Sequence, residues 1–282
     1  MTRLHHSQIF AIPEEIENYD RELAEKTGMN LAEIGRRVKL SGWAGYIKEN
    51  KLENIEDFNL ENIGVAVIPI TAGRGKITGF CEAVRAILVE MGFASVHITQ
   101  TTDVSGINEA LSHKAEVIFM ADDNNFISFN TQKSLIMNND RATARAYIEA
   151  LSAMAGGISQ RNVLVLGAGK VGSECIEYLL ARHAHPVCYE LKEEKAGEIS
   201  QKYKVKCYTS KNLNRLVKDF EIIIDATPAA DIITADMIDK NTYLAAPGIP
   251  AGFTEQAAEK LGSRLIHDPL QLGVAAMAFS VI

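Results

Sequence analysis

The spacing of apolar residues predicts helices in the first part of the chain. Over residues 1–62 the apolar positions recur at helical spacing among many charged residues, and Pro13 followed by two glutamates suits a helix start. We expect Gly28 to end this helix, and Asn30 with Glu33 resembles a capping box that opens a second one. We therefore predict an N-terminal helical segment over residues 1–62.

Short β-branched runs alternating with amphipathic segments follow this helical segment. The runs at 64–71, 95–99 and 116–121 predict buried strands, and helical patterns separate them. Because each helical crossover returns the chain to the same end of the sheet, we expect these strands to pair in parallel. A further strand, FISFN, comes after a short polar turn. These elements predict a small central α/β unit over residues 63–138.

A longer alternation of the same kind begins at residue 139. A helical pattern, which we expect Asp140 to cap, runs to Gly156 and leads to six apolar runs: NVLVL, PVCYE, KVKCY, EIIIDA, TYLAAP and RLIH. Strands separated by helical patterns in this way are typical of a Rossmann-type doubly wound domain, which we place at residues 139–282. The predicted fold is therefore α/β, with an N-terminal helical segment, a small central α/β unit and a C-terminal Rossmann-type doubly wound domain.

The composition excludes several classes of protein. The formal net charge of −7 over 282 residues argues against a nucleic-acid partner, because binding phosphates requires a basic surface. No apolar run in the sequence reaches the roughly 18 residues that a membrane span requires, and the first residues do not have the pattern of a secretory signal. The cysteines, Cys81, Cys175, Cys188 and Cys207, show neither metal-ligand spacing nor the density of a disulfide framework, and core packing is expected for Cys175 and Cys188. We therefore expect a cytoplasmic protein with no membrane partner; the sequence leaves a homodimer open.

The strongest motif is a glycine-rich turn between the strand NVLVL and the helical pattern after it. It comprises Gly167, Ala168, Gly169, Lys170, Val171 and Gly172, and so matches G-x-G-x-x-G. In a dinucleotide-binding turn the first glycine allows the tight turn, the second lets the pyrophosphate approach the backbone, and the third lets the helix pack against the strand. Free N–H groups at the helix N-terminus attract the phosphates. The strand before the turn and the helix after it favour dinucleotide binding over an ordinary glycine turn.

Glu190 ends the strand that follows the glycine-rich turn. A carboxylate at this position accepts hydrogen bonds from the ribose hydroxyls of NAD and repels the 2′-phosphate of NADP. The nearby Lys192 is the only residue that weakens this reasoning. We therefore predict NAD as the cofactor.

Later strands end in small residues and prolines that suit a flat nicotinamide ring, and ligands of open α/β sheets bind at the carboxyl ends of strands. The predicted cofactor-lining residues there are Ala226, Thr227, Pro228, Ala246, Pro247 and Gly248, with His267 at the end of the last strand. The alternative is that these small residues and prolines only form ordinary loops and bind no cofactor. His267 is also a candidate general base, although a His-Asp pair before a helix start is as often a cap arrangement. The histidines show no metal-ligand spacing, so we expect no metal.

Two segments of the central unit are candidates for binding a substrate. The segment TAGRGKITG imitates a phosphate loop but lacks the G-x-x-x-x-G-K-[ST] spacing, so we expect no nucleoside-triphosphate site. Its first residues, Thr71, Ala72 and Gly73, could hold a carboxylate through backbone N–H groups, with plain turn chemistry as the alternative. Asp122 and Asp123 end the strand EVIFMA, where a carboxylate is well placed to bind a substrate amine. Because adjacent residues of an extended chain point to opposite faces, we expect only one of them to reach the site; an Asx turn is the alternative.

Six strings of residues carry a resemblance to one family. They are VIPITAGRGKI, IFMADDNNFISFN, NNDRATARAY, DATPAADII, APGIPAG and HDPLQLGVAAMA. Together they resemble the pyrrolysine-forming dehydrogenases, over nearly the whole chain after the first helices. The resemblance implies NAD-dependent oxidation of the terminal amine of 3-methylornithine linked through an amide to lysine, loss of ammonia, and condensation of the semialdehyde to the pyrroline ring of pyrrolysine. It also implies that Asp122, or its neighbour Asp123, contacts the reacting amine.

The fold leaves other functions open. A small α/β unit before a Rossmann domain is also the plan of shikimate-type, methylenetetrahydrofolate-type and amino-acid dehydrogenases. A shikimate-type enzyme is expected to show a catalytic lysine–aspartate pair in its first domain, and we cannot place one in the sequence. A non-catalytic NAD-binding regulator is a third hypothesis, which NAD binding without turnover of any amine would favour.

Overall fold

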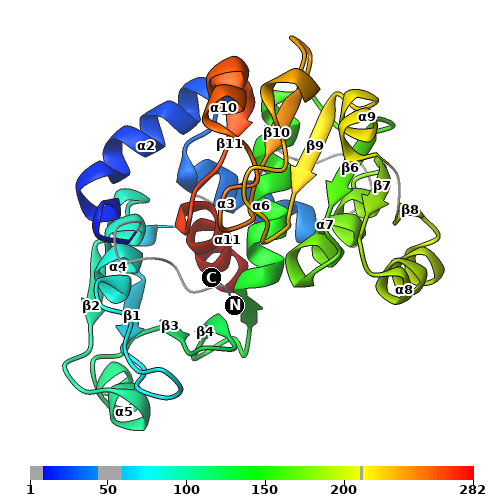
Figure 1. Cartoon of the computed structure of the whole chain (residues 1–282). Helices are drawn as coiled ribbons and strands as arrows, with labels where there is room; N and C mark the ends of the chain where they lie inside the picture. Colours follow the sequence, from blue (N-terminus) through cyan, green and yellow to red (C-terminus); the bar gives the residue numbers. More distant parts are fainter. Residues whose placement is uncertain (1–8, 44–58, 210–211) are drawn as a thin grey trace.

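The structure is a computed structural model that describes residues 9–43, 59–209 and 212–282. Two β-sheets lie on either side of a group of helices near the middle of the molecule (Figure 1). Among the helices within the described ranges, none combines the length and the apolar composition needed to cross a membrane.

The N-terminal part is helical, as expected. Its elements are α2 (Ile12–Thr27), α3 (Leu31–Trp43) and the short 3₁₀ helix η1 (Leu60–Asn62). Gly28, with a φ of 73°, ends α2. The capping box is confirmed: the Asn30 N–H donates to Glu33 Oε2 at 2.8 Å, and the Glu33 N–H donates to Asn30 Oδ1 at 2.9 Å. The rest of the predicted helical segment, residues 1–8 and 44–58, lies outside the described residues.

The central unit contains the first sheet. Its elements are β1 (Gly64–Ile68), α4 (Phe80–Glu90), β2 (Ser95–Ile98), α5 (Asp103–Ser112), β3 (Val117–Ala121), β4 (Phe126–Asn130) and β5 (Ile136–Asn138). The strand order is β2-β1-β3-β4-β5. The first three strands pair in parallel as expected, and β4 and β5 each run antiparallel to the strand before them because short turns join them. The sequence did not predict β5, since a strand of three residues is too short to show a period.

Alternate residues of β1 pack on opposite faces of the first sheet. Val65 and Val67 belong to the main core with residues of α4, whereas Ala66 and Ile68 form a separate cluster with Ala110 of α5. A helix therefore covers each face of this sheet, which explains why its strands are apolar on both sides.

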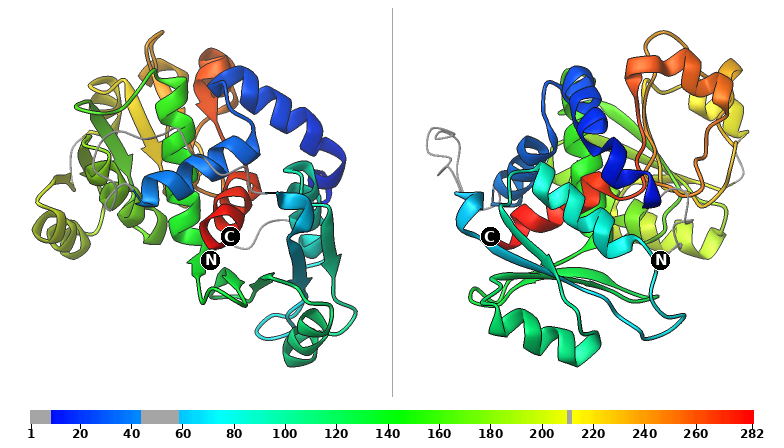
Figure 2. Two further views of the ribbon diagram at one scale, coloured as in Figure 1. Left: turned by 180° about the vertical axis from the view of Figure 1, so that it is seen from behind. Right: turned by 90° about the vertical axis from the view of Figure 1, so that its left-hand side faces the viewer.

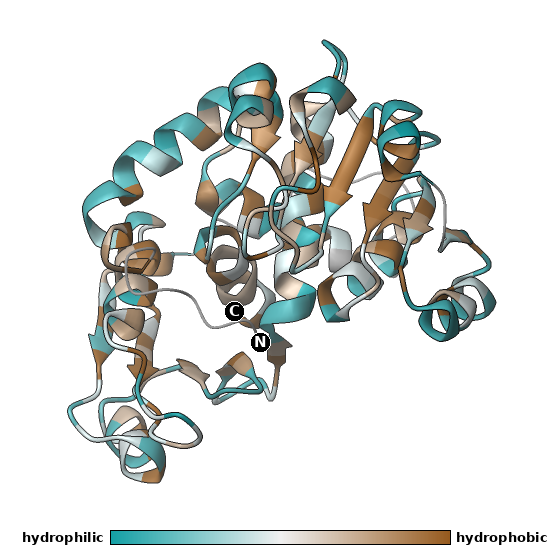
Figure 3. Ribbon diagram, viewed as in Figure 1, coloured by the Kyte–Doolittle hydropathy of each residue, from teal (hydrophilic) through white to brown (hydrophobic). Residues whose placement is uncertain are grey.

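The second sheet has the predicted Rossmann architecture. Its strands are β6 (Asn162–Leu166), β7 (His185–Tyr189), β8 (Lys206–Tyr208), β9 (Ile222–Asp225), β10 (Tyr243–Ala245) and β11 (Leu265–Ile266), and its connections contain α7 (Lys170–Ala181), α8 (Glu193–Tyr203), α9 (Leu213–Lys218), η2 (Ala235–Met237), α10 (Glu255–Leu261) and η3 (Gly262–Arg264). All pairs are parallel, in the order β11-β10-β9-β6-β7-β8. The chain order reverses between β6 and β9, which is where ligands of doubly wound sheets bind. The strands β6 and β9 are strongly apolar, and the outer helices α2 and α8 are largely hydrophilic (Figure 3).

The observed cap of the long helix between the two sheets lies two residues before the predicted cap. Asn138, not Asp140, caps α6 (Asn139–Met154), because its side chain accepts a hydrogen bond from the Arg141 N–H at 2.9 Å. Asp140 lies inside the first turn instead. The prediction of the cap was wrong because β5 ends at Asn138, which fixes where the helix starts.

The last helix, α11 (Gln271–Val281), is apolar on all sides and lies at the centre of the molecule, against α3 and α6 (Figure 2). A Cβ atom added to Gly35 of α3 would lie 2.8 Å from the Ala275 carbonyl oxygen, so α3 and α11 are in close contact. On the other side the Ser128 hydroxyl of β4 donates to the Met277 carbonyl at 3.0 Å. Helix α11 thus packs between the first sheet and the helices α3 and α6, and the predicted domain boundaries stay a prediction.

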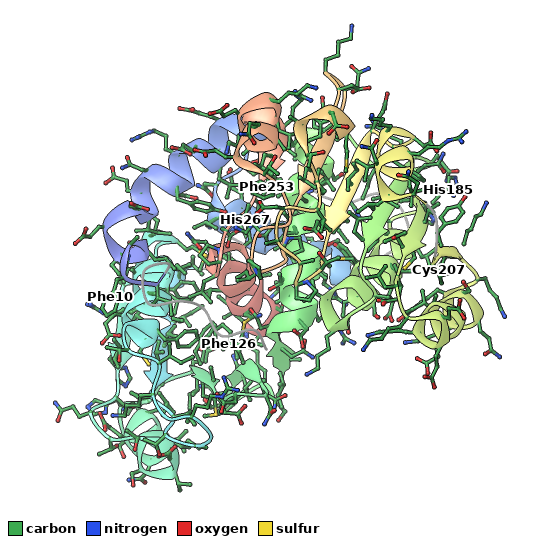
Figure 4. All side chains as sticks on the ribbon, viewed as in Figure 1. Phe10, Phe126, His185, Cys207, Phe253 and His267 are labelled. Carbon is green, nitrogen blue, oxygen red and sulfur yellow. The ribbon has the colours of Figure 1, made fainter. Side chains whose placement is uncertain are left out.

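A histidine in the first sheet leads to a prediction about stability and pH. Burial and the charge of His113, whose ring lies 5.1 Å away, lower the pKa of His97. The unfolded chain therefore binds this proton more readily, and the free energy of unfolding should fall as the pH drops below about 6.5, the ordinary pKa of histidine. We expect His97→Gln to flatten this fall in urea titrations at several pH values. The exposed His185 provides the control (Figure 4), and equal slopes for both variants would contradict the prediction.

Candidate active site

The glycine-rich turn has the geometry of a dinucleotide-binding turn. Gly167 follows β6 with a φ of 82°, which only glycine adopts readily. A Cβ atom on Gly172 would lie 2.0 Å from the Gly167 carbonyl oxygen, so α7 can approach β6 this closely only with glycine there. A Cβ atom on Gly169 would meet no atom within 4 Å and would enter the open space before the helix. That space, facing the N-terminus of α7, fits the pyrophosphate of a nicotinamide dinucleotide.

Glu190 lies beside this turn. Its Oε2 accepts a hydrogen bond from the Ala168 N–H at 2.9 Å, and its Oε1 accepts one from the Lys192 N–H at 3.0 Å. The carboxylate is half-buried at the end of β7. It therefore occupies the place from which an acidic residue reaches the ribose of a dinucleotide in this fold.

The loops after β9 and β10 are held together at the same edge of the sheet. The Gly248 N–H donates to the Asp225 carbonyl oxygen at 3.0 Å, and a Cβ atom on Gly248 would lie 2.2 Å from the Thr227 carbonyl oxygen. The Asp225 Oδ1 accepts hydrogen bonds from the Thr227 N–H at 3.1 Å and hydroxyl at 2.7 Å, and burial raises the pKa of Asp225 to about 6. This packing fixes the positions of the two loops that carry the predicted cofactor-lining residues.

A cavity of about 460 Å³ opens between the two sheets at these loops. Its Rossmann side is lined by Gly169, Lys170, Val171, Ala226, Thr227, Pro228, Pro247, Gly248 and Ile249; its other side is lined by Ile77, Phe80, Asp122, Asp123 and Phe126; and α6 with the segment around the start of α11 contributes Asn139, Asp140, Thr143, Tyr147, Asp268, Pro269, Leu270 and Gly273. The structure thus brings the predicted cofactor turn and the predicted substrate aspartates to one space.

The two aspartates after β3 have different partners. Asp122 Oδ1 accepts hydrogen bonds from the N–H groups of Asn124 and Asn125, both at 2.7 Å, so the Asx turn is present. Asp123 Oδ2 instead accepts the Arg74 N–H at 2.7 Å and so anchors the loop after β1. Both side chains line the cavity. Since Asp123 is committed to the loop, Asp122 is the better candidate for contacting a ligand, through its Oδ2.

The loop after β1 borders a second cavity of about 210 Å³, which shares Asp122 with the first. The residues of this loop that line it are Pro69, Ile70 and 75–79. Within the described part of the chain, neither cavity is lined by Thr71, Ala72 or Gly73. Thr71 is instead tied to the Asp103 carboxylate through its N–H at 2.8 Å and its hydroxyl at 2.6 Å. The contact of Thr71, Ala72 and Gly73 with substrate therefore stays a prediction, and the geometry places the later residues of the loop nearer to the site.

The sequence did not predict the polar group around Asp268, which lies in the wall of the cavity. Asp268 Oδ2 accepts the Tyr19 hydroxyl at 3.0 Å, while the Tyr147 hydroxyl donates to the Asp268 carbonyl oxygen at 2.6 Å. Burial raises the pKa of Asp268, and burial together with the Asp268 charge raises the pKa values of Tyr19 and Tyr147. Asn139, Thr143 and Tyr147 follow each other at a spacing of four on α6, and that period was the signal that could have revealed one face of the site.

His267 lies outside the residues that line the two described cavities. Its Nδ1 is 2.7 Å from the Ala246 carbonyl oxygen, and its ring packs edge-on against Phe253 at 5.3 Å (Figure 4). Asp268 Oδ1 accepts the N–H groups of Leu270 and Leu272, which is the cap arrangement considered for this pair. The structure therefore places Asp268 in the cavity wall, and a cofactor contact by His267 stays a prediction.

The charged groups around the larger cavity are mostly acidic. Among the described residues that line it, four carry carboxylates, namely Asp122, Asp123, Asp140 and Asp268, and one is a cation, Lys170 of the glycine-rich turn. Among the described residues there is no group of three or more side chains that could hold a metal ion. Such a cavity favours a ligand that carries a positive charge and lies next to a bound dinucleotide.

The fold is that of the Rossmann-type dehydrogenases. Solved structures with the same fold include the shikimate dehydrogenase of Aquifex aeolicus, with a TM-score of 0.54 and 15% identity over 77% of this chain and 91% of that one. The quinate dehydrogenase of Corynebacterium glutamicum in complex with NAD has a TM-score of 0.52 and 14% identity over 77% of this chain and 93% of that one. The family model of shikimate / quinate 5-dehydrogenase also matches residues 149–244.

Sequence similarity identifies the family within this class. The model of the pyrrolysine biosynthesis protein PylD, N-terminal domain, matches residues 8–137. The pyrrolysine synthase of Methanosarcina acetivorans is 32% identical over 275 residues, which cover 96% of this chain and 98% of that protein. The pyrrolysine synthase of Methanosarcina barkeri is 34% identical over 218 residues, covering 77% of this chain and 81% of that protein. The chain belongs to the pyrrolysine synthase family, and the resemblance stated from the sequence is confirmed.

Proposed function

We propose that this chain oxidises the terminal amine of lysine-linked 3-methylornithine with NAD and so forms pyrrolysine. The observation that carries the proposal is that the glycine-rich turn and Asp122 line one acidic cavity. The substrate is a small molecule with a cationic amine, and we place the reaction in the cytoplasm.

The cofactor would be held by the residues at the edge of the Rossmann sheet. The N-terminus of α7, which begins at Lys170, would hold the pyrophosphate, and Glu190 would exchange its hydrogen bond with the Ala168 N–H for the ribose hydroxyls. Pro228 and Gly248 would lie beneath the ring. When bound, the nicotinamide ring accepts a hydride.

Asp122 would bind and deprotonate the reacting amine. An ammonium group cannot lose a hydride from its carbon, so one proton must first leave the nitrogen. Oδ2 of Asp122 would hold the ammonium and accept that proton, while Oδ1 stays fixed by the turn. As the hydride leaves the carbon, the nitrogen lone pair forms the C=N bond of the imine.

The later steps need little from the protein. Water adds to the imine and ammonia leaves, which gives the semialdehyde, and the remaining α-amine then attacks the aldehyde carbon with loss of water. Because this condensation is intramolecular, tethering alone lowers the barrier by several kcal/mol (~7–11 for well-oriented groups). The residues that line the cavity would chiefly hold the substrate folded back on itself, with its α-amine near the aldehyde carbon.

The reaction itself provides the direct test. The protein is mixed with NAD and the synthetic lysine–methylornithine amide, and the absorbance of reduced nicotinamide is followed together with the product mass. We expect NADH formation with release of ammonia and no net release of water, because the water consumed in hydrolysing the imine is returned in the condensation. NAD binding without turnover would contradict the proposal and favour the NAD-binding regulator, whereas turnover of a cyclic hydroxy acid instead would favour a shikimate-type activity.

Exchanging the charge at Glu190 tests the predicted cofactor. We expect Glu190→Lys to weaken NAD binding by about tenfold to a hundredfold, since a hydrogen bond to a charged group contributes about 1.5–3 kcal/mol, and to relax the rejection of NADP. Calorimetric titration with each dinucleotide measures both effects. Glu193→Lys, an exposed residue in the first turn of α8, provides the matched control. Unchanged NAD affinity in Glu190→Lys would remove this residue from the cofactor site.

A further inference from the structure

Two cysteines lie side by side on the last two strands at one edge of the Rossmann sheet. Cys188 of β7 and Cys207 of β8 are register partners in this parallel pair, and β8 is the last strand of the sheet. Neighbouring strands are about 4.8 Å apart, which lies within the range of about 4.4–6.8 Å between Cα atoms that a disulfide spans. The backbone can therefore accept a bridge at this position.

The two side chains share one face of the sheet. Cys188 is fully buried in the main core, and Cys207 is half-buried and packed against the same core. The hydrogen bond between the two thiols lowers the pKa of Cys207 and raises that of Cys188. Cys207, on the strand at the molecular edge near α8 (Figure 4), is thus the thiol that reaches solvent and forms the thiolate more readily.

The pair is adjacent to the carboxylate beside the glycine-rich turn. Glu190 lies two residues after Cys188, and its N–H donates to the carbonyl oxygen of Tyr208, the residue after Cys207, at 3.0 Å. A bridge requires Cβ atoms about 3.5–4.5 Å apart, so it would draw the two strands together at this point. Through the hydrogen bond between Glu190 and Tyr208, that movement would reach the backbone of Glu190.

We propose that Cys188 and Cys207 form a reversible disulfide when the protein meets a peroxide, and that this bridge weakens binding of the dinucleotide. The first part is independent of the catalytic activity; the second rests on the proposed function, because it takes Glu190 as a cofactor ligand. The site is a redox modification site within the cofactor-binding edge of the sheet.

The chemistry requires no component beyond the peroxide. The Cys207 thiolate attacks one peroxide oxygen, the O–O bond breaks, and a sulfenic acid and one water form after protonation. The Cys188 thiol then attacks the sulfenic sulfur, its proton passes to the leaving hydroxide, and a second water is released as the S–S bond forms. Two thiols are oxidised by two electrons and one peroxide is reduced to two waters. A dithiol reductant reverses the change.

The other two cysteines provide the controls. Cys175 lies in α7 and Cys81 in α4, and burial raises the pKa of both thiols, that of Cys81 to about 12. A buried thiol with a raised pKa reacts slowly with peroxide. Cys175→Ser should therefore respond to peroxide as the unaltered chain does, whereas Cys207→Ser should not form the bridge.

The experiment uses the full chain in reduced and peroxide-treated forms. Peptide mass mapping should find the Cys188–Cys207 linked peptide, and calorimetry should show roughly tenfold weaker NAD binding, equivalent to about 1.4 kcal/mol, that a dithiol restores. Cys207→Ser should keep full affinity after peroxide, with circular dichroism as the check that it is folded. If mapping finds no linked peptide, or if the linked form binds NAD with unchanged affinity, the proposal is overturned. If the reduced chain binds no NAD, the proposed function and the second part fail together, while mapping still decides the first part.

Discussion

Replacing Asp122 by asparagine is expected to lower kcat by about 10²–10⁴-fold, the usual contribution of a general acid or base, while NAD affinity changes little. Asparagine keeps an Oδ1 that accepts the N–H groups of Asn124 and Asn125, so the turn after β3 should survive. What is lost is the negative charge and the proton acceptor at Oδ2. Steady-state kinetics with the lysine–methylornithine amide and calorimetry with NAD measure the two effects separately.

Asp140→Asn is the matched control for this experiment. Asp140 lines the same cavity from the first turn of α6, and its change removes one charge of equal sign. If the cavity only supplies a general negative potential, both variants should lose activity to a similar extent. A loss in Asp140→Asn as large as that in Asp122→Asn would therefore show that Asp122 is not the proton acceptor. Near-normal turnover in Asp122→Asn would likewise contradict this role for Asp122.

The parts of the site that the sequence predicted are carried by consecutive residues. The glycine-rich turn, the strand ends and Glu190 are each recognisable because a strand, a turn and a helix follow one another within a few residues, so their conformation depends on local sequence. The Asx turn after β3 was likewise a local alternative, since its bonds join residues two and three apart. For these features, the structure has the local geometry that the sequence predicted.

The features that the sequence did not predict depend on contacts between distant segments. Tyr19 and Asp268 are 249 residues apart, and Tyr147 and Asp268 are 121 apart, so no local period could pair them. The difference between the adjacent aspartates also depends on tertiary structure, because the Arg74 N–H reaches Asp123 from a loop 49 residues earlier. The central place of α11 has the same origin: its uniformly apolar sequence indicates burial without indicating against what.

Stability should depend strongly on a buried carboxylate of α6 that is not among the residues lining the larger described cavity. Glu149 of α6 is completely buried. Its carboxylate lies 2.9 Å from Arg37 Nε on α3 and 3.1 Å from Arg182 Nε after α7, and it accepts the Tyr178 hydroxyl at 2.7 Å. The three partners come from two helices that pack on α6 from different directions. Removing the carboxylate would leave a buried hydroxyl and two guanidinium groups without their shared acceptor.

We therefore expect Glu149→Ala to lower the free energy of unfolding by about 3–5 kcal/mol, the usual effect of breaking a buried ion pair. Glu221→Ala is the matched control, because the pair between Arg161 and Glu221 has a similar distance of 3.0 Å while the Glu221 side chain is 60% exposed. Such a surface pair contributes at most about 1 kcal/mol. Urea denaturation of both variants measures the difference, and equal losses would contradict the assignment.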